Sequence, residues 1–216
     1  MRQTNKIRKG IAWLLCTVLV LGILPMLPQM SMQISAAENA ASVFVDGVEL
    51  HAGGKKYFKN GDTADSGATG TDEDHSAYYD TAGELWLNNL EAHTIKANGN
   101  LTIYVCNNQE TNTNIVTATQ NETAIEVTGY LTIQYGGYGE TGSLTVESDG
   151  KEAIQAGSGM TVSDGVEVKV RAKSGATAIS SGGVLKIDGI RTKLEAASDG
   201  STGKGIFAQQ SIYVKN

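Results

Sequence analysis

Apolar residues recur two apart in short runs over most of the chain, and many of these runs come in pairs. The clearest pair is the decamer AIEVTGYLTI, residues 124–133, in which two runs with strand spacing flank a glycine. This pattern predicts a strand, a tight turn and a second strand. Four further copies share it: TIKANGNLTI at Thr94, AIQAGSGMTV at Ala153, AISSGGVLKI at Ala178 and GIFAQQSIYV at Gly205.

The second residue of every copy is isoleucine, so the copies align without ambiguity. Successive isoleucines lie 30, 29, 25 and 27 residues apart, a period that is typical of a repeat architecture. They are Ile95, Ile125, Ile154, Ile179 and Ile206.

A third strand is predicted about ten residues before each of these isoleucines. Three short strands per period, with no helical period between them, predict one coil of a parallel β-helix, whose coils stack about 4.8 Å apart. Parallel crossovers are right-handed by default. The third strands are expected at Leu85–Leu87, Ile115–Thr117, Leu144–Val146, Val168–Val170 and around Leu194.

We therefore predict an all-β fold, a right-handed parallel β-helix (solenoid) of about five coils that occupies residues 81–216. A sandwich of antiparallel hairpins is the alternative, but it would need two-residue turns and alternating strand lengths. The chain ends just after the second strand of the fifth copy, with no polar cap behind it. We expect either that the repeats are truncated there or that another element covers the sheet edges.

Residues 1–37 have the pattern of a signal peptide. Four basic residues precede an apolar run from Ile11 to Leu24, and Ser35-Ala36-Ala37 provides small residues for cleavage. A retained membrane anchor is the alternative, but the run is short and is followed by Pro25 and Pro28. We expect a secreted or cell-surface protein that begins near Glu38 and has no membrane attachment after cleavage.

Residues 38–80 are predicted to form an N-terminal cap. The segment VFVDGVEL, residues 43–50, alternates on both sides of Asp46-Gly47, which is a strong hairpin signal. Residues 60–76 contain almost no apolar side chains and predict a flexible acidic loop. The spacing of the acids in this loop does not match a calcium-binding EF-hand.

Net charge, cysteine count and the absence of catalytic motifs limit the possible functions. Cleavage would leave 13 basic and 23 acidic residues, a net charge of −10, which disfavours nucleic acid as a partner. Only Cys106 would remain, so no intramolecular disulfide could form. The three histidines are dispersed, and neither a His-Glu-x-x-His nor a Gly-x-Ser-x-Gly motif occurs, so we do not expect an enzyme.

Two long turns are the candidate ligand site. The turn contains 11 residues between Ile103 and Ile115 and 10 between Ile133 and Leu144, but only five in the following coil. Insertions in solenoids gather on one face, and aromatic rings beside amides and carboxylates suit sugars. The alternative is that the tyrosines pack on their own coil. The candidate ligand-binding residues are Tyr104, Asn107, Asn108, Tyr130, Tyr135, Tyr138 and Glu140.

A second surface is locally basic. The segment VEVKVRAK, residues 166–173, alternates apolar and mostly basic residues, and Arg191 and Lys193 belong to the next coil. Arginine and lysine pair with carboxylates, so the strip could bind an acidic polysaccharide. The alternative is a solvated sheet face whose charges discourage aggregation.

The decamer pattern, together with AYYDTAGELWLNN at residues 77–89, resembles secreted Gram-positive surface proteins built from β-helix repeats. It looks most like a carbohydrate-binding domain family of right-handed parallel β-helices that contain calcium in some members. The resemblance implies a polysaccharide or glycan partner and calcium as a cofactor. The residue before the Ala-Ile pair is Glu152 in one coil but Thr123 or Thr177 in others, so the metal ligands stay unassigned.

The function expected from the sequence is thus that of a secreted, non-catalytic, carbohydrate-binding β-helix protein. One alternative is a structural or adhesive repeat region of a larger cell-surface protein. A second alternative is a polysaccharide lyase or hydrolase.

Overall fold

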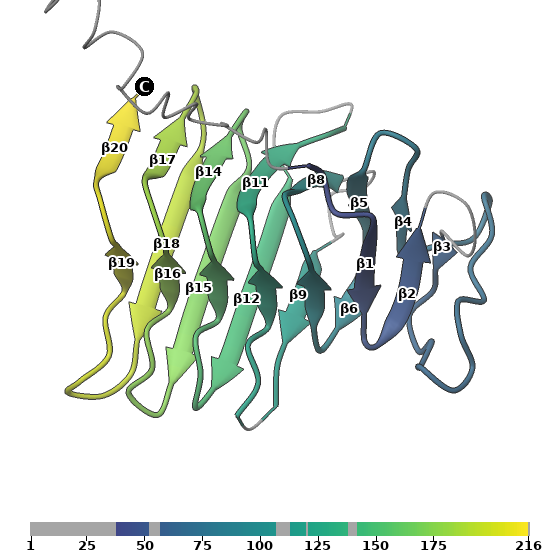
Figure 1. Ribbon diagram of the computed structural model, residues 1–216, viewed down its shortest axis with the longest axis horizontal. Helices are drawn as coiled ribbons and strands as arrows, with labels where there is room; N and C mark the ends of the chain where they lie inside the picture. Colours follow the sequence, from purple (N-terminus) through teal and green to yellow (C-terminus); the bar gives the residue numbers. More distant parts are fainter. Residues whose placement is uncertain (1–37, 52–56, 107–112, 120, 138–141, 216) are drawn as a thin grey trace, which may run out of the picture. The chain divides into compact units, whose positions relative to one another are not determined.

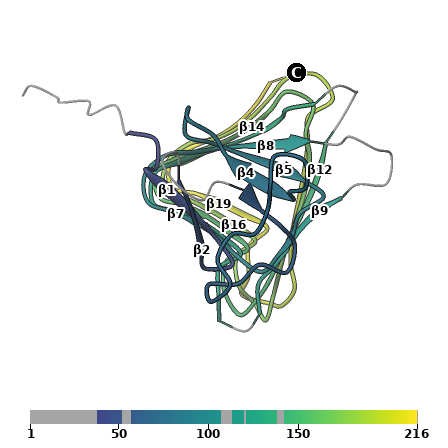
Figure 2. The ribbon, with the colours of Figure 1, turned by 90° about the vertical axis from the view of Figure 1, so that its right-hand side faces the viewer.

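The computed structural model of the chain arranges its strands in three sheets that run along one axis (Figure 1). It describes residues 38–51, 57–106, 113–119, 121–137 and 142–215, and none of these is helical. Along the axis, the three sheets surround one apolar core (Figure 2). The predicted signal peptide, residues 1–37, lies outside the described residues.

The first sheet, here called the isoleucine sheet, contains the first strand of every decamer. Its parallel strands pair so that all five repeat isoleucines are in register, from Ile95 to Ile206. The first four of these side chains are fully buried, and each contributes roughly 1.5–3 kcal/mol relative to exposure. The strands in spatial order are β19 (Ile206–Ala208), β16 (Ile179–Ser181), β13 (Ile154–Ala156), β10 (Ile125–Val127), β7 (Ile95–Ala97), β1 (Ser42–Val45) and β2 (Val48–His51).

The second sheet, here called the threonine sheet, contains the second strand of every decamer. Leu101, Leu131, Met160 and Leu185 occupy equivalent inward positions, and all four are buried. The strands in spatial order are β20 (Ile212–Lys215), β17 (Leu185–Asp188), β14 (Gly159–Ser163), β11 (Tyr130–Tyr135), β8 (Leu101–Cys106), β5 (Glu84–Asn88), β4 (Ala77–Tyr79) and β3 (Tyr57–Phe58).

The third sheet closes each turn of the solenoid and is parallel throughout. Its strands in spatial order are β18 (Lys193–Ser198), β15 (Glu167–Lys173), β12 (Ser143–Asp149), β9 (Asn114–Thr117) and β6 (Glu91–Ala92). Together, the three sheets confirm the predicted all-β parallel solenoid. The five aligned isoleucines mark four complete turns, and the fifth decamer begins the next.

The predicted hairpin cap is present at the N-terminal end. Strands β1 and β2 pair antiparallel around Asp46 and Gly47, whose φ angles of 50° and 76° suit the two central residues of a type I′ turn. Strand β1 then pairs antiparallel with β7, so the hairpin extends the isoleucine sheet beyond the first coil. The Asp46 carboxylate accepts hydrogen bonds from the amides of His93 and Thr94 at 2.7 and 2.8 Å, which fixes the turn to the solenoid.

The segment predicted as a flexible acidic loop has a defined conformation around Asp62. This carboxylate is buried and accepts hydrogen bonds from the Lys59 amide and from the amide and hydroxyl of Thr69. Burial favours the protonated form, but these hydrogen bonds outweigh it, so the pKa of Asp62 lies below its ordinary value. Asp62, one of the acids of the predicted flexible loop, is therefore a buried hydrogen-bond acceptor that orders this loop.

Two details of the predicted third strand are wrong. Leu85–Leu87 belongs to β5, which pairs with β8 in the threonine sheet. The reason is that the third strand of this turn is only β6, two residues long, so counting back ten residues from Ile95 reaches the preceding strand.

The other error concerns β9, where the alignment is shifted by one residue. Asn114, not Ile115, is the partner of Leu144, so Asn114 points into the core and Ile115 points outward. Because side chains alternate along a strand, a shift of one residue exchanges the two faces. The buried Asn114 amide is fully used: Oδ1 accepts from the Leu90 amide at 3.0 Å, and Nδ2 lies 3.3 Å from the carbonyl oxygens of Cys106 and Ser143.

Candidate functional site

The outer face of the threonine sheet carries ordered columns of polar and aromatic side chains. Inward leucines and isoleucines alternate with outward residues along each strand, and parallel register aligns the outward residues of successive coils. Thr102, Thr132 and Thr161 form one such column, each half-buried between its neighbours. Their hydroxyls repeat about every 4.8 Å along the solenoid.

An aromatic column runs beside the threonines. Strand pairing aligns Tyr78 with Trp86 and Trp86 with Tyr104. The rings of Tyr78 and Trp86 are stacked with centroids 5.8 Å apart and planes 5° from parallel. Those of Trp86 and Tyr104 are 4.1 Å apart and 9° from parallel. Each stacked pair adds roughly 0.5–1.5 kcal/mol beyond its buried area, so the column is a stable feature of the cap end.

Two more rings extend this column at the N-terminal end of the sheet. Tyr57 lies 6.0 Å from Tyr78, and His75 contacts both of them, 5.4 Å from Tyr57 and 5.2 Å from Tyr78. The His75–Tyr78 contact is edge-to-face. The aromatic column is therefore defined by Tyr57, His75, Tyr78, Trp86 and Tyr104.

Carboxylates accept hydrogen bonds from the polar atoms of three of these rings. The Trp86 indole Nε1 donates to Asp80 Oδ2 at 3.1 Å, the Tyr104 hydroxyl donates to Glu84 Oε1 at 3.3 Å, and the Tyr57 hydroxyl donates to Asp72 Oδ1 at 2.6 Å. The pKa of Glu84 is raised, first by burial and then by the charge of Asp80. The ring column thus has an acidic rim.

Gly136, in the second long turn, fits against this column. A Cβ on Gly136 would lie 2.7 Å from Tyr104 Cδ1 and 3.0 Å from Trp86 Cζ3, so only glycine fits without moving the rings. The Gly136 amide also donates to the Val105 carbonyl at 3.2 Å. The chain leaving β11 therefore packs directly on the Tyr104 ring.

Of the seven predicted ligand residues, two lie on this outer face. Tyr104 belongs to the aromatic column. On the neighbouring strand, Gln134 is the partner of Tyr104, and Tyr130 lies four residues before Gln134, roughly 13 Å along the strand. Its hydroxyl is 2.7 Å from Thr161 Oγ1, and its ring packs against Gly159 of the next coil.

Tyr135, another of the predicted residues, does not lie on this outer face. Tyr135 pairs with the buried Val105, and its ring packs against the core rather than on the outer face. The cause is again the alternation of the strand, which places Tyr135 opposite in sense to Gln134. Asn107, Asn108, Tyr138 and Glu140 lie outside the described residues.

Sequence reasoning missed the other members of the site. Tyr57, Tyr78 and Trp86 were not assigned to it, and neither was the threonine column. The signal was available for Trp86, because the alternation Leu85-Trp86-Leu87 places the indole outward once β5 is assigned to the threonine sheet. The threonines were visible at the centres of Leu101–Ile103, Leu131–Ile133 and Met160–Val162.

The basic strip is an ion-paired sheet face. Arg171 contacts Asp199 at 2.8 Å, Lys173 contacts Glu147 at 3.2 Å, and Lys169 contacts Glu167 at 3.2 Å. Carboxylates of the same or neighbouring coils thus balance these cations. This geometry favours the interpretation as a solvated, charge-paired face over a site for acidic polysaccharides.

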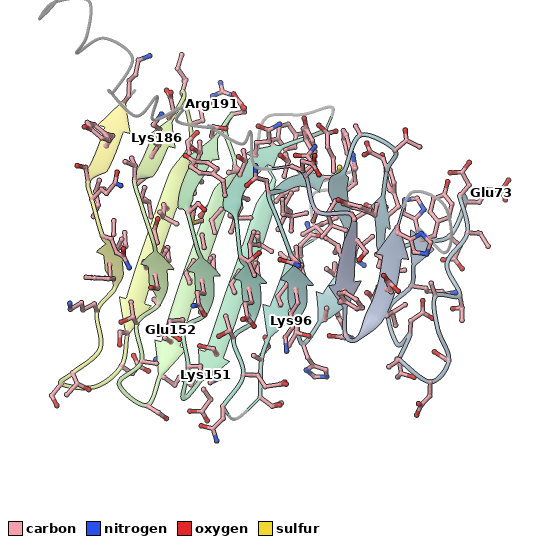
Figure 3. All side chains as sticks on the ribbon, in the orientation of Figure 1. Glu73, Lys96, Lys151, Glu152, Lys186 and Arg191 are labelled. Atoms are coloured by element: carbon pink, nitrogen blue, oxygen red, sulfur yellow. The ribbon has the colours of Figure 1, made fainter. Side chains whose placement is uncertain are left out.

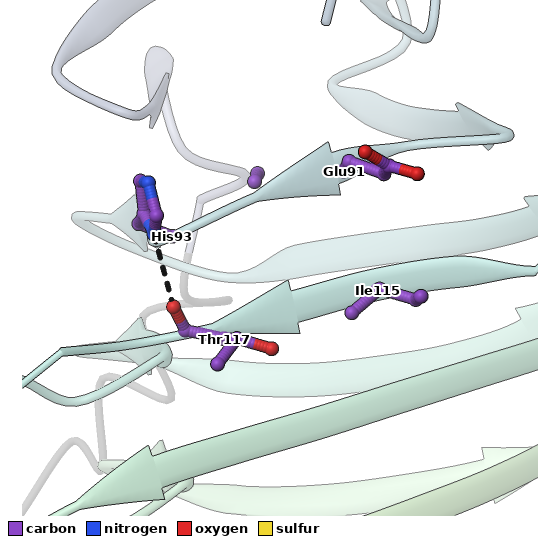
Figure 4. A pocket seen from close by; sticks show the side chains of 5 residues that line it. Glu91, His93, Ile115 and Thr117 are labelled. Atoms are coloured by element: carbon purple, nitrogen blue, oxygen red, sulfur yellow. Dashed lines mark hydrogen bonds between the residues drawn. The ribbon is translucent and has the colours of Figure 1, made fainter.

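A hollow at the edge of the third sheet surrounds His93 (Figure 4). His93 Nδ1 lies 3.1 Å from the Thr117 carbonyl oxygen, which can only accept, so this nitrogen carries the proton. Glu91 and the outward Ile115 line the same hollow. Among the described residues, no group of three or more His, Cys, Asp or Glu side chains is placed to hold a metal ion.

Cys106 is buried at the end of β8, and its thiol donates to the Gly136 carbonyl at 3.4 Å. Burial raises its pKa from 9.0 to about 11. The thiol is therefore protonated at neutral pH and is not an activated nucleophile.

Searches against protein-family models, curated proteins and solved structures find no match for this chain. The class of protein is therefore defined by the fold itself, an all-β solenoid with repeats of 25 to 30 residues. No helix in the described part of the chain is long and apolar enough to span a membrane.

Proposed function

We propose that this solenoid is a secreted, non-catalytic, polysaccharide-binding protein and that the outer face of the threonine sheet contacts the glycan. The observation that carries the proposal is the aromatic column beside the threonine column. Polysaccharide surfaces combine apolar CH groups with hydroxyls, which suit aromatic side chains and protein hydroxyls, respectively. The N-terminal pattern of basic, apolar and small residues supports secretion.

The repetition of outward side chains along this face also supports an extended ligand. Thr102, Thr132 and Thr161 lie on three successive strands of one sheet, and Gln134 continues the column of Trp86 and Tyr104. A polymer lying along the axis would meet the same kind of group at every coil. A small ligand would gain nothing from this repetition.

Binding to a panel of polysaccharides by affinity gel electrophoresis tests the proposal. The panel contains cellulose-type glucans, xylans, pectins and mucin glycans, and the variant is Thr132→Val, which removes one hydroxyl but keeps the β-branched shape. The matched control is Thr145→Val, which makes the same change on the outer face of the third sheet. We expect retardation by at least one polysaccharide, weakened by T132V and unchanged by T145V.

Absence of retardation by every polysaccharide for the folded protein would contradict the proposal. Release of reducing ends or unsaturated products from any of them would replace it with a lyase or hydrolase. Calcium remains a prediction of the resemblance, and comparing the melting temperature in calcium chloride with that in EDTA checks it.

A structural or adhesive repeat is the second candidate, and the last described coil favours it. Ile212, Tyr213 and Val214 of β20 are exposed by 49%, 58% and 67%, and Ile206 and Leu194 are only partly buried. A second copy stacked on β18, β19 and β20 would bury these side chains and pair their backbone groups. Light scattering tests this: concentration-dependent association that Val214→Lys abolishes would support it, and a monomer at all concentrations would oppose it.

A further inference from the structure

We infer that the aromatic column selects polysaccharides without anionic groups, an inference that rests on the proposed function and narrows its ligand class. The starting observation is that carboxylates hold the polar atoms of three rings of the column. The Trp86 indole, the Tyr104 hydroxyl and the Tyr57 hydroxyl each donate to a carboxylate. What the rim offers a ligand is therefore carboxylate oxygen, an acceptor.

One rim carboxylate, that of Asp80, is fixed in place by the backbone. Asp80 Oδ1 accepts from the amides of Ala82 and Glu84 at 2.9 and 3.0 Å, so this side chain cannot turn away from the rings. Glu84 follows four residues later and faces the Tyr104 hydroxyl. An approaching uronate or sulfate group would meet two negative charges held close together.

Among the described lysines, the one beside β3 is paired and the first one in register with the rim is distant. Lys59, which follows β3, contacts Asp74 at 2.5 Å. Strand pairing aligns Glu84 with the three threonines and then with Lys186. Lys186 is thus four strands from Glu84, roughly 19 Å away. That is more than twice the screening length of about 8 Å at physiological salt. Figure 3 shows Glu73 at one end of the solenoid and Lys186 near the other.

Sugar hydroxyls fit the same rim without conflict. A hydroxyl donates its proton to a carboxylate oxygen and accepts from a neighbouring threonine hydroxyl, so both of its roles are met by Glu84 and Thr102, which are aligned across β5 and β8. An ammonium group of an amino sugar would also donate to the rim. A carboxylate ligand can only accept hydrogen bonds, so it gains none from Glu84 and is repelled by its charge.

The test compares hexasaccharides of equal length by isothermal titration calorimetry at low and at physiological ionic strength. The probes are neutral β-glucan, xylan and mannan hexamers and an oligogalacturonide hexamer. We expect a neutral hexamer to bind about 10-fold more tightly than the oligogalacturonide at low ionic strength, with the difference shrinking as salt screens the rim.

The variant is Glu84→Gln, which removes the charge but keeps a carbonyl acceptor for the Tyr104 hydroxyl. The matched control is Glu126→Gln, which makes the same charge change on the outer face of the isoleucine sheet. E84Q should narrow the preference about 3-fold, and E126Q should leave it unchanged; equal melting temperatures establish that both variants fold. Two results would overturn this inference but not the proposed function. One is that the oligogalacturonide binds as tightly as the neutral hexamers, and the other is that E84Q does not alter the preference for neutral hexamers. Failure of every hexamer to bind would overturn the proposed function with it.

Discussion

The indole of Trp86 stacks on the phenol ring of Tyr104 with centroids 4.1 Å apart, although the two residues are 18 positions apart in sequence. The parallel pairing of β5 with β8 creates this contact by placing both side chains at the same outward position. The antiparallel pairing of β4 with β5 places Tyr78 on the other side of the indole. One ring thereby links the antiparallel cap to the first parallel coil.

Replacing Trp86 with alanine should weaken both the fold and glycan binding. The change removes two stacked contacts and part of the area that the indole buries, so we expect a loss of about 2–4 kcal/mol in the free energy of unfolding. Urea unfolding followed by circular dichroism measures it. Trp86→Phe retains a ring at the same place and should lose about half as much. Equal stability of the alanine and phenylalanine variants would show that the stack contributes little.

Asn114→Ala should destabilise the protein more than its small change in volume suggests. The substitution leaves the buried Leu90 amide without its acceptor and removes the amide donor that faces two carbonyl oxygens. We expect a loss of about 2–3 kcal/mol in the free energy of unfolding. Thr117→Ala, on the exposed side of the same strand, is the matched control and should change stability by about 0.5 kcal/mol or less. A neutral effect of N114A would mean that water replaces the amide.

The repeat, the hairpin cap and the parallel register were predictable because each depends on a short, regular pattern. A column of isoleucines every 25 to 30 residues can be buried only by stacking, and Asp46-Gly47 between alternating apolar residues specifies a tight hairpin. Asn114 was not predictable, because its core position depends on three backbone partners, two of which are more than 20 residues away in sequence.

The candidate site could be predicted only in part, for a similar reason. Tyr104 was found because it begins a long turn. Its stacking partner Trp86 belongs to a strand whose sheet was misassigned, since β6 is shorter than the other third-sheet strands. The side on which Tyr135 lies is set by its register with Val105, which its neighbours in sequence do not reveal.

Gly182→Ala should be one of the most destabilising single changes in the solenoid. A Cβ at this position would lie 1.8 Å from the carbonyl oxygen of Gly157, which occupies the same corner one coil earlier. The backbone of both coils would have to move apart, and we expect a loss of about 3 kcal/mol. Thermal unfolding measures it, with Ser180→Ala on the outward face of β16 as the control. A G182A protein as stable as the control would show that the corner between the sheets is not tightly packed.

The thiol of Cys106 should make the fold less stable above pH 9. Burial raises its pKa from 9.0 to about 11, so between these values the unfolded chain loses this proton while the folded chain keeps it. Its contribution is fully present below pH 9 and declines as the pH rises, by about 1.4 kcal/mol per pH unit at most. Cys106→Ala removes this titration, so the decline in unfolding free energy between pH 8.5 and pH 10.5 should be smaller in the variant.

Alkylation of the folded protein by iodoacetamide at pH 8 should be slow and should become fast in urea. Two results together would contradict the burial of this thiol: rapid alkylation under native conditions, and an unfolding free energy that declines equally with pH in the wild-type protein and in C106A.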